Sequence, residues 1–65
     1  MKITINGDAR EVTSTDLAGL LLELGYGEVV VATAVNEAFV PMGQRADLEL
    51  AAGDRVEVLT PMQGG

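Results

Sequence analysis

The chain has 65 residues, of which 48% are hydrophobic and 22% charged, a composition typical of one small folded domain rather than of a disordered segment. It has no cysteine and no histidine, which excludes disulfides, Cys/His zinc sites and catalytic groups that need either side chain. Ten acidic and four basic residues give a net charge of −6, which disfavours nucleic acids and anionic membranes and favours a protein partner with a basic face.

The first 13 residues predict a β-hairpin. Residues 2–5 alternate polar and apolar side chains, as a half-buried strand does, and residues 9–13 are typical of the returning strand. Between them lies Asn6-Gly7, the pair that a type I′ turn prefers because both of its central residues need a positive φ. This N-terminal segment has no apolar run of signal-peptide length, and we therefore expect a cytoplasmic protein.

A helix is predicted over residues 15–24. Residues 13–16, Thr-Ser-Thr-Asp, are all candidates for its N-cap, because their side-chain oxygens can accept the free N–H groups of the first turn. Gly25 is the expected C′ residue, where a positive φ carries no Cβ penalty. The helix face that packs on a core is defined by leucines with helical spacing: Leu17, Leu20, Leu21 and Leu24.

Three further strands are predicted after the helix. Residues 29–35 are rich in β-branched side chains and predict a buried strand, and residues 38–40 predict a short strand that Pro41 ends. Residues 42–51 are expected to be irregular, with Leu48 and Leu50 pointing inward, and residues 55–60 form the last strand. Turns are expected at residues 36–37 and 53–54. This order of elements indicates an α+β fold with one helix on a mixed sheet.

The last strand predicts an exposed apolar residue close to the C-terminus. Val56 and Val58 share one face because side chains alternate along a strand, and we expect them to point at the leucines of the helix. Leu59 then lies on the opposite face, which no helix covers. Single exposed apolar residues are common, so the phase alone leaves open whether Leu59 is a docking residue or carries no function. Phe39 is a second candidate for an interface.

The C-terminal residues offer the most distinctive chemical group of the chain. The α-carboxylate of Gly65 has a pKa of about 3.3–3.7 in model peptides, so it is an anion at neutral pH and can attack the α-phosphate of ATP to give an acyl-adenylate. Glycine at the last two positions suits a narrow channel because it has no Cβ. Residues 61–65 span about 16–18 Å when fully extended. Pro61 would stiffen the start of this segment, and Gln63 could add polar contacts inside the channel.

Three segments carry a resemblance to a known family. The run Gly-Asp-Arg-Val-Glu-Val at 53–58, the terminal Gln-Gly-Gly at 63–65, and Ala-Val-Asn-Glu at 34–37 followed by Phe-Val-Pro at 39–41 are similar to the ubiquitin-like β-grasp sulfur carriers, above all those of thiamine biosynthesis. The resemblance covers the whole chain. It implies a β-grasp domain over residues 1–60, with a mixed sheet of four to five strands and one main helix on one face, and a flexible tail over residues 61–65.

The resemblance also implies a function. The carboxylate of Gly65 would be adenylated by an E1-like enzyme that uses ATP and magnesium, sulfur from a persulfide donor would then replace AMP, and the resulting thiocarboxylate would give its sulfur to thiazole synthase. The carrier would act as a co-substrate, with no catalytic residue, metal or bound cofactor of its own, and as a monomer when alone. Leu59, Phe39 and Pro61 would contact the partner, and the tail would enter its active site: Met62, Gln63, Gly64 and Gly65.

Three other functions remain open at the level of the sequence. A sulfur carrier of the molybdopterin-synthase small-subunit type would use the same fold and the same terminal chemistry. A ubiquitin-like modifier would instead be joined through Gly65 to lysines of its targets. A simple interaction module would keep its function without the last two glycines.

Overall fold

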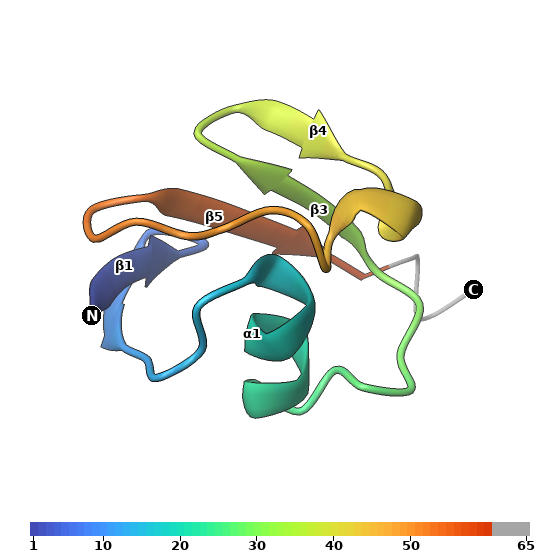
Figure 1. Ribbon diagram of the computed structural model, residues 1–65, viewed down its shortest axis with the longest axis horizontal. Helices are drawn as coiled ribbons and strands as arrows, with labels where there is room; N and C mark the ends of the chain where they lie inside the picture. The colour runs from blue at the N-terminus through green and yellow to red at the C-terminus, as the bar shows by residue number, and fades with distance from the viewer. Residues whose placement is uncertain (61–65) are drawn as a thin grey trace.

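In the computed structural model, which describes residues 1–60, five strands form one mixed sheet and a helix packs across one of its faces (Figure 1). The strand order is β2-β1-β5-β3-β4. The central pair, β1 and β5, is parallel, and the other three pairs are antiparallel. The elements are β1 (Lys2–Ile5), β2 (Asp8–Glu11), α1 (Leu17–Glu23), β3 (Ala32–Val35), β4 (Ala38–Val40), the 3₁₀ helix η1 (Met42–Gln44) and β5 (Arg55–Leu59). The α+β class and the mixed sheet with one covered face are therefore confirmed.

The predicted hairpin is confirmed, and the helix is shorter than expected. Asn6 and Gly7 have φ values of 52° and 89°, as a type I′ turn requires. The helix begins after Asp16, whose Oδ1 accepts a hydrogen bond from the Gly19 N–H at 2.7 Å. It starts later than predicted because Asp16 has extended backbone and forms an isolated β-bridge with Glu49. Gly25, with φ 91°, follows its C-cap as expected.

The predicted strand over residues 29–35 is wrong in its first half. β3 begins only at Ala32, and Val30 is 69% exposed although Val31 is buried. β-Branched residues favour a strand, but a strand also needs a partner in the sheet. The last paired positions of β3 are Ala32 with Leu59 on one side and Thr33 with Val40 on the other. Residues 29–31 therefore have no strand beside them within the described part of the chain.

The segment between β4 and β5 agrees with the prediction in its anchors but contains a short helix. Leu50 is buried and Leu48 packs partly buried against the core, as predicted. The turn at residues 36–37 is also confirmed, with positive φ at both Asn36 and Glu37. The 3₁₀ helix η1 occupies residues that were expected to be irregular.

The core lies between the helix and the sheet, and its inward residues on the central strands were correctly predicted. Val56 and Val58 are buried, whereas Glu57 and Leu59 point to the other face of the sheet. Leu24 is partly buried against the core, and the other three leucines of the predicted face are buried within it. Among residues 1–60 there is no helix whose length and apolar character would allow it to cross a membrane. The core consists of Ile3, Ile5, Val12, Leu17, Leu20, Leu21, Val31, Val35, Val40, Leu50, Val56 and Val58.

Candidate functional site

The candidate site is the outer sheet face at the end of β5, from which the chain leaves the sheet. Leu59 is 65% exposed there, which confirms its predicted orientation. Its cross-strand partner on β3 is Ala32, a residue too small to cover it. The last described residue, Thr60, follows directly. An apolar side chain therefore stands immediately before the C-terminal segment.

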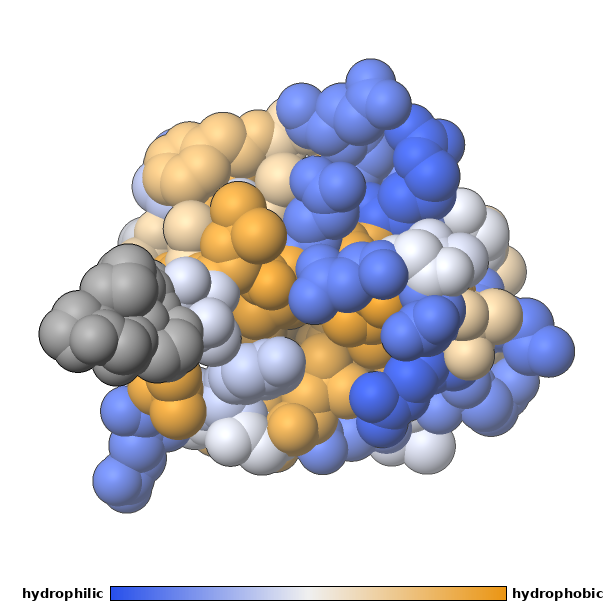
Figure 2. Space-filling model, turned by 180° about the vertical axis from the view of Figure 1, so that it is seen from behind, coloured by the Kyte–Doolittle hydropathy of each residue, from blue (hydrophilic) through white to orange (hydrophobic). Residues whose placement is uncertain are grey.

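Phe39 lies on the same face, on the other side of β3. It is 69% exposed and pairs with Ala34, which in turn pairs with Glu57 of β5. Ala32 and Ala34 are both small, so the outer face of β3 is lower than the side chains on either side of it. Phe39 and Leu59 are those side chains. Figure 2, which shows the molecule from behind, has hydrophobic residues from the middle of this face to the side where β5 finishes, and more hydrophilic residues towards the opposite side. Such a surface suits apolar contact with another protein.

The end of β5 is held in place by a side chain from the first turn. β1 pairs with β5 only at Thr4 with Arg55 and at Ile5 with Val56, and then turns away. Beyond this point the Asn6 amide takes the place of a neighbouring strand: its Oδ1 accepts from the Val58 N–H at 2.9 Å, and its Nδ2 donates to the Val58 carbonyl at 3.1 Å. This contact and the pairing with β3 hold β5 in place as far as Leu59.

A small cavity of about 280 Å³ lies beside the start of the C-terminal segment. Its lining includes Val30 and Val31 from the loop before β3, together with Leu59 and Thr60. The sequence did not indicate Val30 as a surface residue, since residues 29–31 are three consecutive valines and show no alternation from which to infer a face. The apolar surface at the end of β5 is therefore larger than the sequence suggested.

Electrostatic contacts near the site are weak. Arg55 Nη2 and Glu37 Oε2 are 3.6 Å apart, and both side chains are largely exposed, so this ion pair contributes little to stability. Asp54 stabilises the turn before β5 by accepting a hydrogen bond from the Ala51 N–H at 2.8 Å. Within residues 1–60 no group of acidic side chains is arranged to hold a metal ion.

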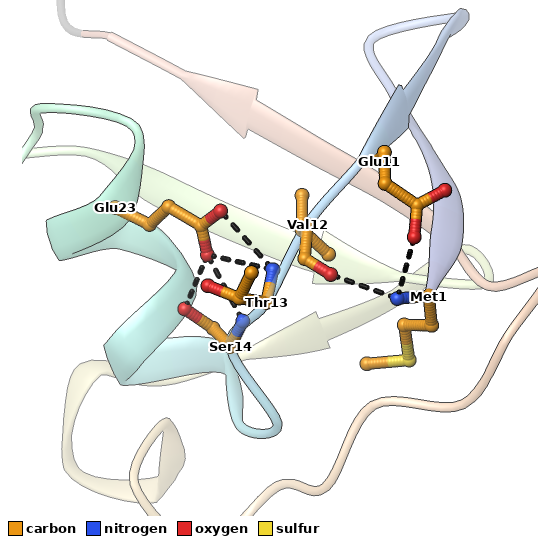
Figure 3. A network of polar contacts seen from close by, with 6 residues as sticks. All are labelled: Met1, Glu11, Val12, Thr13, Ser14 and Glu23. Atoms are coloured by element: carbon orange, nitrogen blue, oxygen red, sulfur yellow. Dashed lines mark hydrogen bonds and ion pairs between the residues drawn. The ribbon is translucent and has the colours of Figure 1, made fainter.

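The polar network around Glu23 lies between the end of α1 and the segment that leads into it (Figure 3). The Glu23 carboxylate accepts hydrogen bonds from the Ser14 hydroxyl at 2.6 Å, from the Ser14 N–H at 3.0 Å and from the Thr13 N–H at 3.1 Å. The Ser14 hydroxyl, followed by the Thr13 N–H, lowers the pKa of Glu23 below its usual value of 4.5, because these bonds favour the charged form. In the same figure the Met1 amino group contacts Glu11 and Val12. The Glu23 contacts tie the segment before α1 to the end of that helix, and the Met1 contacts close the N-terminal hairpin.

The predicted site residues thus fall into two groups. Phe39 and Leu59 share one exposed face of the sheet, as a docking surface requires. Pro61 and the four tail residues, Met62, Gln63, Gly64 and Gly65, lie outside the described residues. What residues 1–60 provide is a rigid support, with an apolar face around the position from which those five residues start.

One helix across a five-stranded mixed sheet with this strand order is the ubiquitin-like β-grasp fold. The chain matches the ThiS family over residues 3–65, and it belongs to that family. The crystal structure of a thiamine biosynthesis protein (ThiS) from Geobacter metallireducens is similar to it throughout, with a TM-score of 0.84, 26% sequence identity and coverage of 100% of both chains. No curated protein sequence is significantly similar. The family resemblance inferred from the sequence is therefore confirmed.

Proposed function

We propose that this protein is a cytoplasmic sulfur carrier of thiamine biosynthesis and that the carboxyl group of Gly65 carries the sulfur. The observation that supports this most is the match to the ThiS family over residues 3–65, which includes the terminal Gly-Gly. The similarity to a thiamine biosynthesis protein supports the same pathway. The exposed Leu59 and Phe39 agree with it, because a carrier must dock on the enzymes that act on its C-terminus.

The chemistry begins at the terminal carboxylate. An oxygen of Gly65 attacks the α-phosphorus of ATP on an E1-like enzyme, the bond to pyrophosphate breaks, and an acyl-adenylate results. The terminal sulfur of a persulfide donor then attacks the carbonyl carbon, and AMP leaves with the electrons of the broken C–O bond. A thiol cleaves the resulting acyl disulfide and leaves a thiocarboxylate. Magnesium and ATP belong to the activating enzyme in this scheme, and the carrier contributes only the reacting end.

The folded part contributes position. The Asn6 amide and the pairing with β3 hold β5 as far as Leu59, so the tail starts from a fixed point. From Thr60, five residues reach about 16–18 Å, which is far enough to carry the carboxylate from a docked domain into an enzyme channel. Thiazole synthase is the proposed acceptor of the sulfur, and it would receive the same tail. The carrier therefore needs no catalytic side chain.

Reconstitution with purified enzymes tests the proposal. The full chain is incubated with the E1-like enzyme, ATP, magnesium, a persulfide donor and a thiol, and its intact mass is measured. We expect a gain of about 16 Da, the replacement of one oxygen by sulfur. A chain that lacks Gly64 and Gly65 is the matched control and should gain nothing. No gain by the full chain, with an enzyme shown to activate its own carrier, contradicts the proposal.

The acceptor is tested in a second step. The activated chain is mixed either with thiazole synthase or with the large subunit of molybdopterin synthase, each with its other substrates. We expect the added mass to be lost with thiazole synthase and to be kept with the molybdopterin-synthase subunit. Loss only with the molybdopterin-synthase subunit would reassign the carrier to that pathway, and a high-mass adduct on lysines of other proteins would make it a modifier.

A further inference from the structure

A second apolar surface lies on the helix side of the molecule. A groove of about 440 Å³ runs between α1, the loop that follows it and η1. Of the six large hydrophobic residues that are exposed in the described chain, two are Phe39 and Leu59 on the sheet face. The other four all line this groove: Leu22, Val29, Val30 and Met42. Their concentration in one place indicates a contact surface rather than scattered exposure.

The groove is mainly apolar, with one charged residue of each sign in its lining. Arg45 lines it, but its guanidinium is bonded to β3 and the loop before it: Nε donates to the Thr33 hydroxyl at 3.0 Å and Nη2 to the Val31 carbonyl at 2.6 Å. Glu28 is the other charged residue of the lining, and it forms no ion pair with any residue of the range 1–60. The two charges of the lining are of opposite sign, so a ligand that fits this surface is recognised chiefly through apolar side chains.

The groove adjoins the cavity at the start of the C-terminal segment. Val30 and Val31 line both the groove and that cavity, whose other walls include Leu59 and Thr60. Five residues reach only about 16–18 Å, so an enzyme that acts on the Gly65 carboxylate has to come close to Thr60. Val30 and Leu59, which line the same cavity as Thr60, are then the apolar residues nearest to that enzyme. The apolar surface continues from there into the groove.

We propose that the E1-like activating enzyme holds this protein on both sides of the tail, with apolar residues inserted into the groove. This proposal rests on the proposed function and adds a second contact to it. Contact on both sides of Thr60 fixes the direction of the tail better than contact with the sheet face alone. The net charge of −6 favours encounter with a partner that has a basic face.

Lysine substitutions in the groove test this second contact. Leu22→Lys and Met42→Lys each remove an apolar contact and place a positive charge before a basic partner. Both residues are 68% exposed, and a lysine at the end of α1 is favourable for the helix, so we expect both variants to keep their melting temperature. Ala9→Lys, an exposed position on β2, is the matched control for the added charge. Affinity for the activating enzyme, measured by titration calorimetry, should fall about tenfold or more for the groove variants and stay unchanged for Ala9→Lys.

The outcomes separate this proposal from the one on which it rests. The groove contact is overturned if Leu22→Lys and Met42→Lys are folded and bind the enzyme as tightly as the wild type does. The sulfur-carrier function still stands in that case, provided that the wild-type chain is activated in the same assay. A wild-type chain that is never activated refutes the function instead. If one groove variant unfolds, the other carries the test. The proposal is also overturned if sedimentation shows that the wild type is a dimer, that the groove variants are monomers, and that these variants keep their affinity for the enzyme. The groove would then bind a second copy of the chain.

Discussion

Asn6 and Val58 are 52 positions apart in the sequence, yet the side-chain amide of the first pairs with both backbone polar groups of the second. β1 leaves the sheet after Ile5, and without Asn6 the Val58 N–H and carbonyl would lose their partner on that side. The turn that lets β1 leave also places the amide, since Asn tolerates the φ of 52° found there. One residue therefore ends the first hairpin strand and secures the last strand.

Asn6→Gly removes this pairing while keeping the positive φ. We expect the free energy of unfolding to fall by about 1–3 kcal/mol, because a backbone donor and a backbone acceptor lose their partner. Hydrogen exchange of the Val58 amide, measured by NMR, should become faster, and exchange at Val35 on β3 should change only as much as the global stability does. Unchanged exchange at Val58 would show that the amide does not hold β5.

Two leucines of α1 provide a matched pair for the core. Leu20 is 0% exposed and Leu22 is 68% exposed, so Leu20→Ala opens a cavity and Leu22→Ala does not. We expect a loss of about 2–5 kcal/mol for Leu20→Ala and less than about 0.5 kcal/mol for Leu22→Ala. Chemical denaturation followed by circular dichroism measures both. Equal losses for the two variants would mean that the helix is packed differently.

Leu59→Glu tests the outer sheet face as a docking surface. The side chain is exposed and follows the last buried residue of β5, so a carboxylate there stays in water and the melting temperature should remain near that of the wild type. Affinity for the activating enzyme should fall about tenfold or more, because a charge is buried without a partner in the complex. Val58→Glu is the contrasting variant and should unfold the domain. A large loss of melting temperature with Leu59→Glu would place Leu59 inside the core.

Glu23 gives the stability a defined dependence on pH. Its pKa is lowered in the folded state, mainly by the Ser14 hydroxyl, so its contribution is present above the unfolded value near 4.5 and is lost as the pH falls through the folded pKa. Glu23→Gln should therefore be less stable than the wild type at neutral pH, and the difference should shrink as the pH falls below 4.5. Melting temperatures recorded across this range check the sign. A difference that grows as the pH falls would contradict it.

Local rules predicted the elements that depend on neighbouring residues. The type I′ turn at Asn6-Gly7, the buried face of α1 and the alternation along β5 that exposes Leu59 each follow from spacings of a few residues, and each was found. The match to the ThiS family likewise confirmed the fold that the quoted segments implied. The candidate interface could be predicted to this extent because Leu59 lies on a strand with a clear phase, whereas Phe39 was named without one.

Long-range pairing could not be predicted in the same way. The valines at 29–31 have strand propensity, but β3 starts only at Ala32 because its partners end at Leu59 and Val40. The groove could not be predicted for a related reason. Leu22 and Met42 are far apart in the sequence, and they line one groove only in the folded protein. The contact between Asn6 and Val58 depends on the register of a parallel pair, which no local pattern contains.

The position of the sulfur on the chain is the measurement that tests the central claim most directly. Fragmentation mass spectrometry of the activated protein assigns the mass change to a residue. We predict a gain of about 16 Da on the C-terminal fragments that contain Gly65 and on no fragment that ends before it. A gain on any other residue, or an activated chain whose C-terminal fragments keep their original mass, would contradict the role of the Gly65 carboxylate.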